Sequence, residues 1–304
     1  MDYQSILNII QKEFTPEPSM GKVAGYIPEL SKIDPLKLGM HLYCIDDTSY
    51  EFGDSQEKFS IQSISKVFTL TLAKELLGKD LWKRVDVEPS GTAFNSLIEL
   101  ERENGIPRNP FINAGSIVVA DALMSTLDNP KDDLLQFVRK LCGDNDIDYD
   151  ESVARSERKH GYRNKALVNY MKSLGNINNK TETILDFYFH QCSIAMTCEQ
   201  LSKAFMLFAN KGKHFQTQEQ VIAPQSVKRI NSIMQICGFY DEAGEFSYRV
   251  GLPGKSGVGG GIVAVHPEQY AVTVWSPMLN KKGNSSLGMK VLEELTSLTG
   301  LSIF

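Results

Sequence analysis

The segment around Ser63 holds residues whose types and spacing suit acyl-transfer chemistry. Ser63 and Lys66 are three residues apart, so both side chains share one face if the segment is helical. Apolar residues follow at intervals of four before a glycine stop: Ile64, Phe68, Leu72, Leu76 and Gly78. This pattern predicts a buried helix with Ser63 in its first turn. A serine placed there could be a nucleophile whose proton the lysine accepts.

The Ser-x-x-Lys spacing alone is weak evidence, because it occurs four times in the chain: Ser19/Lys22, Ser55/Lys58, Ser63/Lys66 and Ser156/Lys159. The pair at 63 and 66 differs in lying among apolar residues. A lysine acting as a base at neutral pH needs its pKa lowered from about 10.4 to about 7–8. The structural alternative is a lysine whose ammonium group reaches the surface.

A glycine-rich segment at residues 251–261 supports the catalytic interpretation. Its Lys255-Ser256-Gly257 occurs once and matches the Lys-[Ser/Thr]-Gly element that accompanies Ser-x-x-Lys in penicillin-recognising enzymes. A free N–H there, such as that of Val258, could bind an oxyanion together with the N–H of Ser63. A glycine-rich turn or a phosphate loop is the alternative, but the Walker spacing and a following helix are missing.

Three other polar segments have structural explanations when the residues are considered alone. Residues 156–164 favour a solvated charged turn, and Asn113 is suited to capping a helix N-terminus. The acidic residues 144–150 resemble a calcium loop, but Tyr149 and Arg155 stand where Gly and Glu are required. We therefore expect a solvated turn that caps the following helix, and no metal site.

The distribution of strand and helix signals predicts an α+β fold. One β-hairpin is expected over residues 38–54, a helical block over 60–226, strands again over 245–277 with a hairpin at 262–275, and a helix from 284. One antiparallel sheet joining both hairpins, with terminal helices on it, is the economical packing. A single domain over 1–304 follows, with an α/β part (about 1–60 and 227–304) and a helical part (about 61–226).

Composition excludes several classes of protein. The net charge of −5 argues against general nucleic-acid binding, which needs clustered lysine and arginine. No signal peptide and no run of 18 apolar residues is apparent, so we expect a cytoplasmic protein without a membrane span. The five cysteines form no Cys-x-x-Cys pair, which favours reduced thiols.

Taken together, ordered segments along residues 6–298 resemble the serine-dependent, β-lactamase-like glutaminases. The resemblance rests on residues 25–30, 62–66, 109–115, 156–158, 163–164, 186–189, 237–241, 251–261, 275–277 and 283–285. It implies a serine β-lactamase or penicillin-binding-like fold, and hydrolysis of L-glutamine to L-glutamate and ammonia. It also implies a homodimer or homotetramer that needs no metal or organic cofactor.

The resemblance further assigns roles to individual residues. Ser63 matches the family's nucleophile and Lys66 its activating base, while Tyr240 and Tyr188 match candidates for proton relay. The positions that match the lining of the glutamine pocket are Tyr26, Gln62, Ser63, Asn113, Glu157, Asn164, Tyr188, Tyr240 and, through its backbone, Val258. Glu157 is suited to the α-ammonium group of the substrate.

One departure and two rival functions accompany the resemblance. Tyr162 stands where the family usually has Asp, and we expect it to tune the rim of the pocket. The first rival is a penicillin-recognising acyl-transfer enzyme, against which the missing secretory signal stands. The second is a non-catalytic binding protein on the same scaffold, although every residue named above is present.

Overall fold

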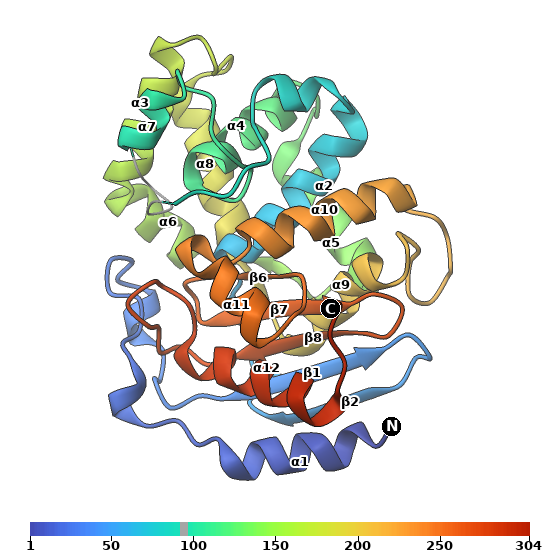
Figure 1. Ribbon diagram of the computed structural model, residues 1–304. Coiled ribbons are helices and arrows are strands. Elements are labelled where there is room, and N and C mark those ends of the chain that lie inside the picture. Colours follow the sequence, from blue (N-terminus) through green and yellow to red (C-terminus); the bar gives the residue numbers. More distant parts are fainter. Residues whose placement is uncertain (92–96) are drawn as a thin grey trace.

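One large antiparallel sheet organises the chain in the computed structural model, which describes residues 1–91 and 97–304 (Figure 1). Its strands follow the order β2-β1-β8-β7-β6. Their bounds are β1 Gly39–Cys44, β2 Ser49–Gly53, β6 Gly254–Ser256, β7 Gly261–His266 and β8 Tyr270–Trp275. Both predicted hairpins are present, and β1 pairs with β8 to join them, as the sequence predicts.

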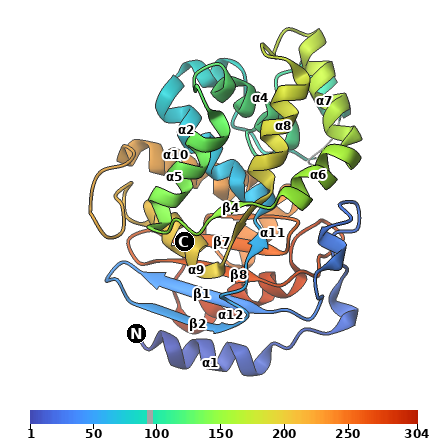
Figure 2. The same cartoon turned by 180° about the vertical axis from the view of Figure 1, so that it is seen from behind.

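Both faces of this sheet are covered, which explains why its central strands are apolar almost throughout. On β7, Val263 and Val265 belong to the core shared with the helical layer, where α9 packs against β1, β7 and β8. Ile262 and Ala264, on the opposite face, belong to the core under the two terminal helices. Figure 2 shows α1 below the sheet, α12 behind its lower strands, and most of the remaining helices above it.

Twelve α-helices are described, and most lie in the layer above the sheet in Figure 1. They are α1 Tyr3–Glu13, α2 Ser65–Leu77, α3 Leu97–Arg102, α4 Asn113–Met124, α5 Pro130–Cys142, α6 Glu151–His160, α7 Tyr162–Ser173, α8 Thr181–Cys192, α9 Cys198–Ala209, α10 Pro224–Cys237, α11 Ala243–Arg249 and α12 Ser286–Thr299. The expected tail helix is α12. Strands were expected from residue 245, but α11 occupies that position and β6 begins only at Gly254.

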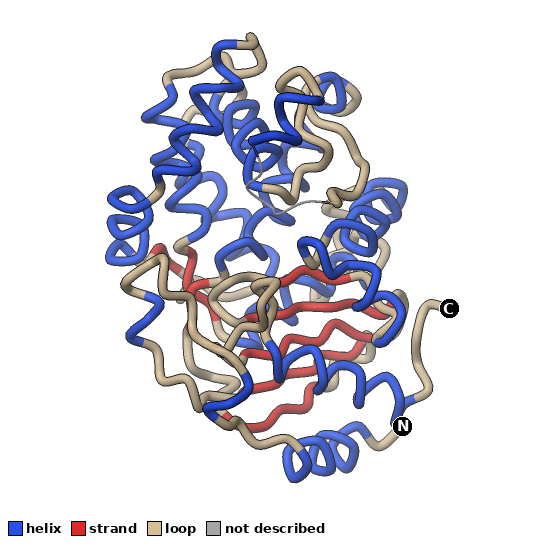
Figure 3. The backbone as a smooth tube through the Cα atoms, turned by 60° about the vertical axis from the view of Figure 1, so that its left-hand side comes forward, coloured by secondary structure: helices blue, strands red, loops and turns tan. Residues whose placement is uncertain are grey.

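A second, smaller sheet was not predicted. It consists of β3 Phe59–Ser60, β5 Ile194–Met196 and β4 Asp148–Tyr149 in the order β3-β5-β4. Figure 3 shows these short strands next to the large sheet, toward the helical layer. They tie the segment that enters the Ser63 turn to the end of α8, so they help to position the candidate nucleophile.

The turn predicted over the acidic residues 144–150 caps a helix, as expected. The Asp150 side chain accepts hydrogen bonds from the backbone N–H groups of Ser152 and Val153 at the start of α6. Across the described ranges, no group of three or more His, Cys, Asp or Glu side chains is placed to hold a metal ion.

All five cysteines are free and buried. Burial raises the pKa of the Cys142, Cys192 and Cys237 thiols to about 12. The prediction of unpaired thiols is confirmed.

Candidate active site

Ser63 lies in a tight 3₁₀ turn, Gln62–Ile64, immediately before α2 rather than inside that helix. The turn is anchored at its start, where the Ile61 N–H donates to the Ile194 carbonyl at 2.9 Å. Gln62 has φ of +50°, an uncommon conformation for a residue other than glycine. Such backbone conformations persist where the surroundings impose them, and they cluster at functional sites.

Lys66 is buried with only 1% of its surface exposed, so the alternative of a surface-reaching lysine is wrong. Its Nζ donates to Asn113 Oδ1 at 2.7 Å and to the Phe111 carbonyl at 3.1 Å. Burial lowers the pKa of Lys66 to about 8, although the charges of Cys192 and Glu157 act in the opposite direction. The lysines of the other three Ser-x-x-Lys pairs are all exposed: Lys22, Lys58 and Lys159.

Asn113 connects Lys66 to a second amide. Because its Oδ1 accepts from the lysine, its Nδ2 faces away and donates to Asn164 Oδ1 at 3.0 Å. The expectation that Asn113 caps a helix is wrong, since Ile112 is the N-cap residue of α4. Asn109 satisfies the free backbone groups instead, accepting from the N–H groups of Phe111 and Ile112.

A cavity of about 160 Å³ lies next to these amides. Its lining residues are Tyr26, Ile27, Asn113, Glu157, His160, Gly161, Arg163 and Asn164. Glu157 and Asn164 are buried on α6 and α7, so the interpretation of residues 156–164 as a solvated turn is wrong. Burial raises the pKa of the Glu157 carboxyl to about 7, while a hydrogen bond with Gln62 and the charge of Lys66 act to lower it.

Two tyrosines of the predicted pocket have contrasting environments. Tyr26 is 57% exposed and lies at the mouth of the cavity. Tyr188 is buried on α8, and its ring centroid lies 5.9 Å from Lys66 Nζ. Burial raises the pKa of Tyr188 well above its ordinary value. Tyr188 is therefore a neutral phenol beside the lysine at physiological pH.

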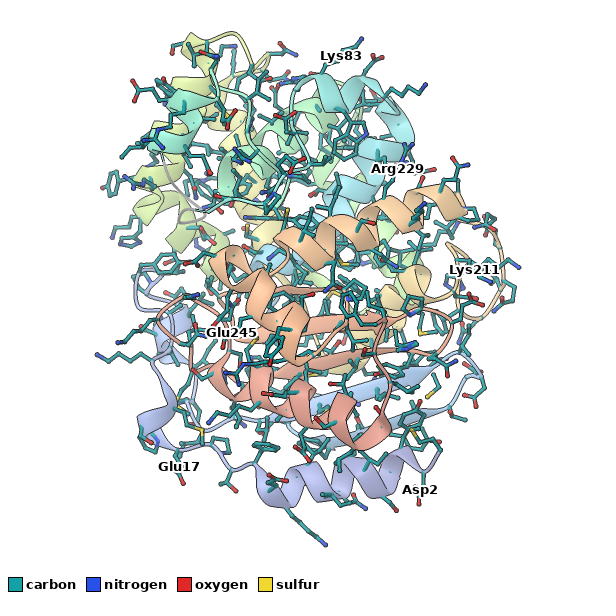
Figure 4. All side chains as sticks on the ribbon, viewed as in Figure 1. Asp2, Glu17, Lys83, Lys211, Arg229 and Glu245 are labelled. Carbon is teal, nitrogen blue, oxygen red and sulfur yellow. The ribbon has the colours of Figure 1, made fainter. Side chains whose placement is uncertain are left out.

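The opposite wall of the site comes from the large sheet. Lys255 on β6 is completely buried, unlike Asp2, Lys83 and Lys211, which lie at the periphery in Figure 4. Its Nζ donates to the carbonyls of Gly238 and Ser256 at 2.9 and 2.6 Å. Burial, followed by the nearby charge of Lys66, lowers the pKa of Lys255 well below its ordinary value.

Tyr240 links this wall to the nucleophile. It occupies the 3₁₀ turn Tyr240–Glu242 with φ of +56°, and its ring centroid lies 4.7 Å from Lys255 Nζ. Burial raises the pKa of Tyr240 to about 12, although hydrogen bonds with Ser63 and Ser256 act in the opposite direction. The phenol is therefore protonated at physiological pH.

The glycine loop after β6 lies directly against the Ser63 turn. A Cβ atom on Gly257 would be 2.4 Å from the Ile61 carbonyl oxygen, and one on Gly259 would be 2.2 Å from that of Ser60. Only glycine permits this approach. Val258, between these glycines, packs in a small cluster with Tyr240. The loop thus brings the Val258 backbone toward the nucleophile.

All ten predicted residues are connected through these contacts.

A family model described as Glutaminase matches residues 21–304. The chain belongs to the glutaminase family. A relative named Glutaminase from Christiangramia forsetii is 64% identical and covers 100% of both chains. Another, from Saccharophagus degradans, is 59% identical and covers 100% of this chain and 99% of its own.

Solved structures agree with the family assignment. A structure described as a probable glutaminase has a TM-score of 0.93 at 31% identity and covers 99% of this chain and 97% of its own. A probable glutaminase from Bacillus subtilis, complexed with 6-diazo-5-oxo-L-norleucine, has a TM-score of 0.86 at 30% identity over 99% and 95%. The protein is therefore an amidohydrolase with a β-lactamase-like fold, as the resemblance implies.

Sequence reasoning left several neighbours of the site unassigned. Lys255 and Ser256 were recognised as part of a motif but were not predicted as site residues. The signal that could have identified them is that this motif accompanies Ser-x-x-Lys in penicillin-recognising enzymes. Asn284 is completely buried and accepts from the Ser256 hydroxyl at 2.6 Å. In the sequence, the only signal for Asn284 was its position in residues 283–285, one of the segments that resemble the family.

Tyr162 is a surface residue of the enzyme. It is 72% exposed, and Lys165 Nζ lies 4.8 Å from its ring centroid. It is not one of the residues that line the cavity, although its neighbours Gly161 and Arg163 are. Its influence on the rim of the pocket stays a prediction. None of the helices in the described ranges is long and apolar enough to cross a lipid bilayer.

Proposed function

We propose that the enzyme hydrolyses the side-chain amide of L-glutamine through a γ-glutamyl ester on Ser63, with Lys66 as the base. The observation that carries this proposal is the environment of Lys66, a buried amine held by Asn113 with its pKa at about 8. A substantial fraction of such a lysine is neutral near physiological pH, so it can accept the Ser63 proton.

Acylation then forms a C–O bond and breaks a C–N bond. Ser63 Oγ attacks the amide carbon, and the resulting oxyanion lies between the backbone N–H groups of Ser63 and Val258. Collapse of the tetrahedral intermediate expels the nitrogen as ammonia, after protonation by Lys66 or a tyrosine hydroxyl. Water next attacks the ester, releases L-glutamate and returns the proton to Ser63.

Recognition of the amino-acid end of the substrate falls to the cavity beside Asn113. The carboxylate of Glu157 suits the α-ammonium group, and the amides of Asn113 and Asn164 suit hydrogen bonds to the same end. A solved structure at 30% identity, described as a glutamate form, supports an amino-acid ligand of this size. Glu157 thus has a function that acyl transfer by itself does not require.

Ammonia release from L-glutamine by the purified protein tests the proposal, with Ser63→Ala and L-asparagine as controls. We expect release that needs both glutamine and Ser63, with Ser63→Ala losing at least about 10³-fold in kcat. A fully active Ser63→Ala enzyme would contradict the serine ester. Stoichiometric labelling of Ser63 by a fluorescent penicillin would instead favour the penicillin-recognising class, and glutamine binding without ammonia release would favour a binding protein.

A further inference from the structure

A second cavity, of about 830 Å³, lies beside the Val258 loop on the sheet wall of the site. The lining residues that matter here are Lys22, Tyr26, Val258, Lys281, Lys282 and Gly283. Tyr26 also lines the cavity beside Asn113, so the two cavities share this side chain. One cavity therefore adjoins the helical wall of the site and the other adjoins the sheet wall.

Two segments far apart in the sequence form the walls of this second cavity. The Lys22 N–H donates to the Leu279 carbonyl at 3.2 Å, and the Leu279 N–H donates to the Lys22 carbonyl at 2.9 Å. These two segments lie side by side in Figure 1, one after α1 and the other before α12. A Cβ atom on Gly283 would lie 3.7 Å from the Tyr240 ring and 3.9 Å from the Val258 side chain. The cavity thus reaches the two residues of the sheet wall that lie beside the nucleophile.

The size of the second cavity exceeds what glutamine needs on this side. The amino-acid end of the substrate suits the cavity beside Asn113, and the amide carbon must meet Ser63. The atoms beyond that carbon, the amide oxygen and nitrogen, then face the Val258 loop. Ammonia fills only a small part of a cavity whose volume is typical of those that bind organic ligands. The cavity therefore has room for a substituent on the amide nitrogen.

The charge of this cavity favours an anionic substituent. Lys22, Lys281 and Lys282 are exposed, and none of the described residues that line the cavity is acidic. Lys282 Nζ donates to the Asp241 carbonyl at 3.3 Å, which places its ammonium group against the turn that contains Tyr240. Since the whole chain has a net charge of −5, a cavity with three cations stands out from the rest of the molecule.

A γ-glutamyl dipeptide has a carboxylate at a suitable position. Its second amino acid is joined to the γ-carbonyl carbon through its amino group, so its carboxylate lies one residue beyond the bond that breaks. One residue spans at most about 3.3–3.6 Å, so this carboxylate stays near Tyr240 and Gly283. Lys282 directly precedes Gly283, and its ammonium group is long enough to meet a carboxylate there.

We propose that the second cavity is a leaving-group subsite and that the enzyme also hydrolyses γ-glutamyl dipeptides, with Lys22, Lys281 and Lys282 attracting the carboxylate of the departing amino acid. This proposal rests on the proposed acyl transfer through Ser63. Ser63 Oγ forms a C–O bond to the γ-carbonyl carbon, the C–N bond breaks, and the amino acid leaves after its nitrogen takes a proton from the donor that serves ammonia. Water then hydrolyses the ester to L-glutamate.

Two substrates that differ in charge test the subsite: γ-L-glutamylglycine and γ-L-glutamylglycinamide. Release of L-glutamate measures both reactions. We expect both to be hydrolysed, with kcat/KM about 5- to 10-fold higher for the dipeptide, because several exposed lysines each contribute modestly. The ratio should fall toward one in 0.5 M salt, since exposed charges are then screened.

Replacing all three lysines by Gln should remove this preference. In the triple variant the ratio should fall to within about twofold of one, while kcat/KM for L-glutamine stays within about twofold of the original. The matched control is Lys290→Gln, because Lys290 is an exposed lysine that lines the neighbouring cavity. Its ratio should equal that of the unmodified enzyme, and thermal unfolding should show that every variant is folded.

Two outcomes would overturn the subsite: no glutamate release from γ-L-glutamylglycine by an enzyme that hydrolyses glutamine, or a preference for the dipeptide that survives in the folded triple variant. Ser63→Ala with L-glutamine keeps the two proposals apart. An active Ser63→Ala protein overturns the proposed function, whereas an inactive one beside an unreactive dipeptide overturns only the leaving-group subsite.

Discussion

Two lysines are fully buried on opposite walls of the site, and they differ in what surrounds the amine. On the helical wall, Lys66 Nζ contacts a side-chain amide and one carbonyl. On the sheet wall, Lys255 Nζ contacts two backbone carbonyls. A neutral amine has two N–H groups, so Lys255 is fully satisfied without a charge. Burial thus lowers the pKa of both lysines, and at Lys66 the charges of Cys192 and Glu157 act in the opposite direction.

Replacing each lysine by Met gives the sharpest test of this contrast. We expect Lys66→Met to lower kcat by more than about 10³-fold, because the base is lost. Lys255→Met should lower kcat by only about 10- to 100-fold. It should lower the unfolding free energy more clearly, by about 1–3 kcal/mol, because the buried Ser256 carbonyl loses its donor. Ammonia-release kinetics and thermal unfolding measure both effects.

The matched control for Lys66 is Lys159, the exposed lysine of another Ser-x-x-Lys pair. Lys159→Met should leave kcat within about twofold of the original. Equal losses in the Lys66 and Lys255 variants would contradict the division of roles between the two walls.

A smaller, pH-dependent effect is expected at Glu157 on the helical wall. Glu157→Gln should raise KM for glutamine about 10- to 100-fold, because the α-ammonium loses a charged partner. In the unmodified enzyme the pKa of Glu157 is about 7, so kcat/KM should fall as the pH drops below about 7 and the carboxyl protonates. In the pH profile of kcat/KM, the Glu157→Gln enzyme should lose the decrease that comes from Glu157 and keep the decrease that comes from protonation of Lys66. An unchanged KM would remove Glu157 from substrate binding.

Glu157→Gln should stabilise the folded chain, although it weakens substrate binding. The pKa of Glu157 rises on folding from 4.5 to about 7, so the folded chain binds the proton more tightly than the unfolded chain. The unfavourable contribution therefore develops as the pH rises through this window. Glu157→Gln should raise the midpoint of thermal unfolding at pH 8 and have little effect at pH 4. Such a gain is typical of a group retained for function.

The smallest effect is expected at the outer edge of the helical wall. Tyr162 is largely exposed, so Tyr162→Asp, which introduces the residue that we expect here from the family resemblance, should change kcat/KM by less than about twofold. A tenfold change in KM, measured by the same assay, would place this position in substrate selection.

The sequence predicted the sheet wall better than the helical wall. Both hairpins were found because β1, β7 and β8 are six-residue, largely apolar strands, and a polar turn separates the two strands of each hairpin. The short strands β3, β4 and β5 have two or three residues, too few for a periodic pattern. The charged residues 156–164 favoured a solvated turn, because a single buried carboxylate among exposed charges has no signature in composition. Only the resemblance to a family identified Glu157 and Asn164.

Backbone conformation was the other part of the site that the sequence did not predict. Gln62 and Tyr240 both have positive φ, although neither residue type favours it. Their conformations follow from contacts distant in sequence, such as the anchoring of Ile61 to Ile194. Local propensity therefore predicts the helices and strands around the site. It does not predict the turns that contain Gln62 and Tyr240.

The buried, unpaired thiols have a practical consequence for following the unfolding of this enzyme. A thiol whose pKa is raised by burial carries little thiolate, the form that reacts with alkylating dyes. The native chain should therefore take up such a dye slowly at all five cysteines, whereas unfolding exposes each of them to the dye. Because the cysteines lie in both the sheet and the helical layer, mass spectrometry of partly labelled samples can report which layer opens first on heating.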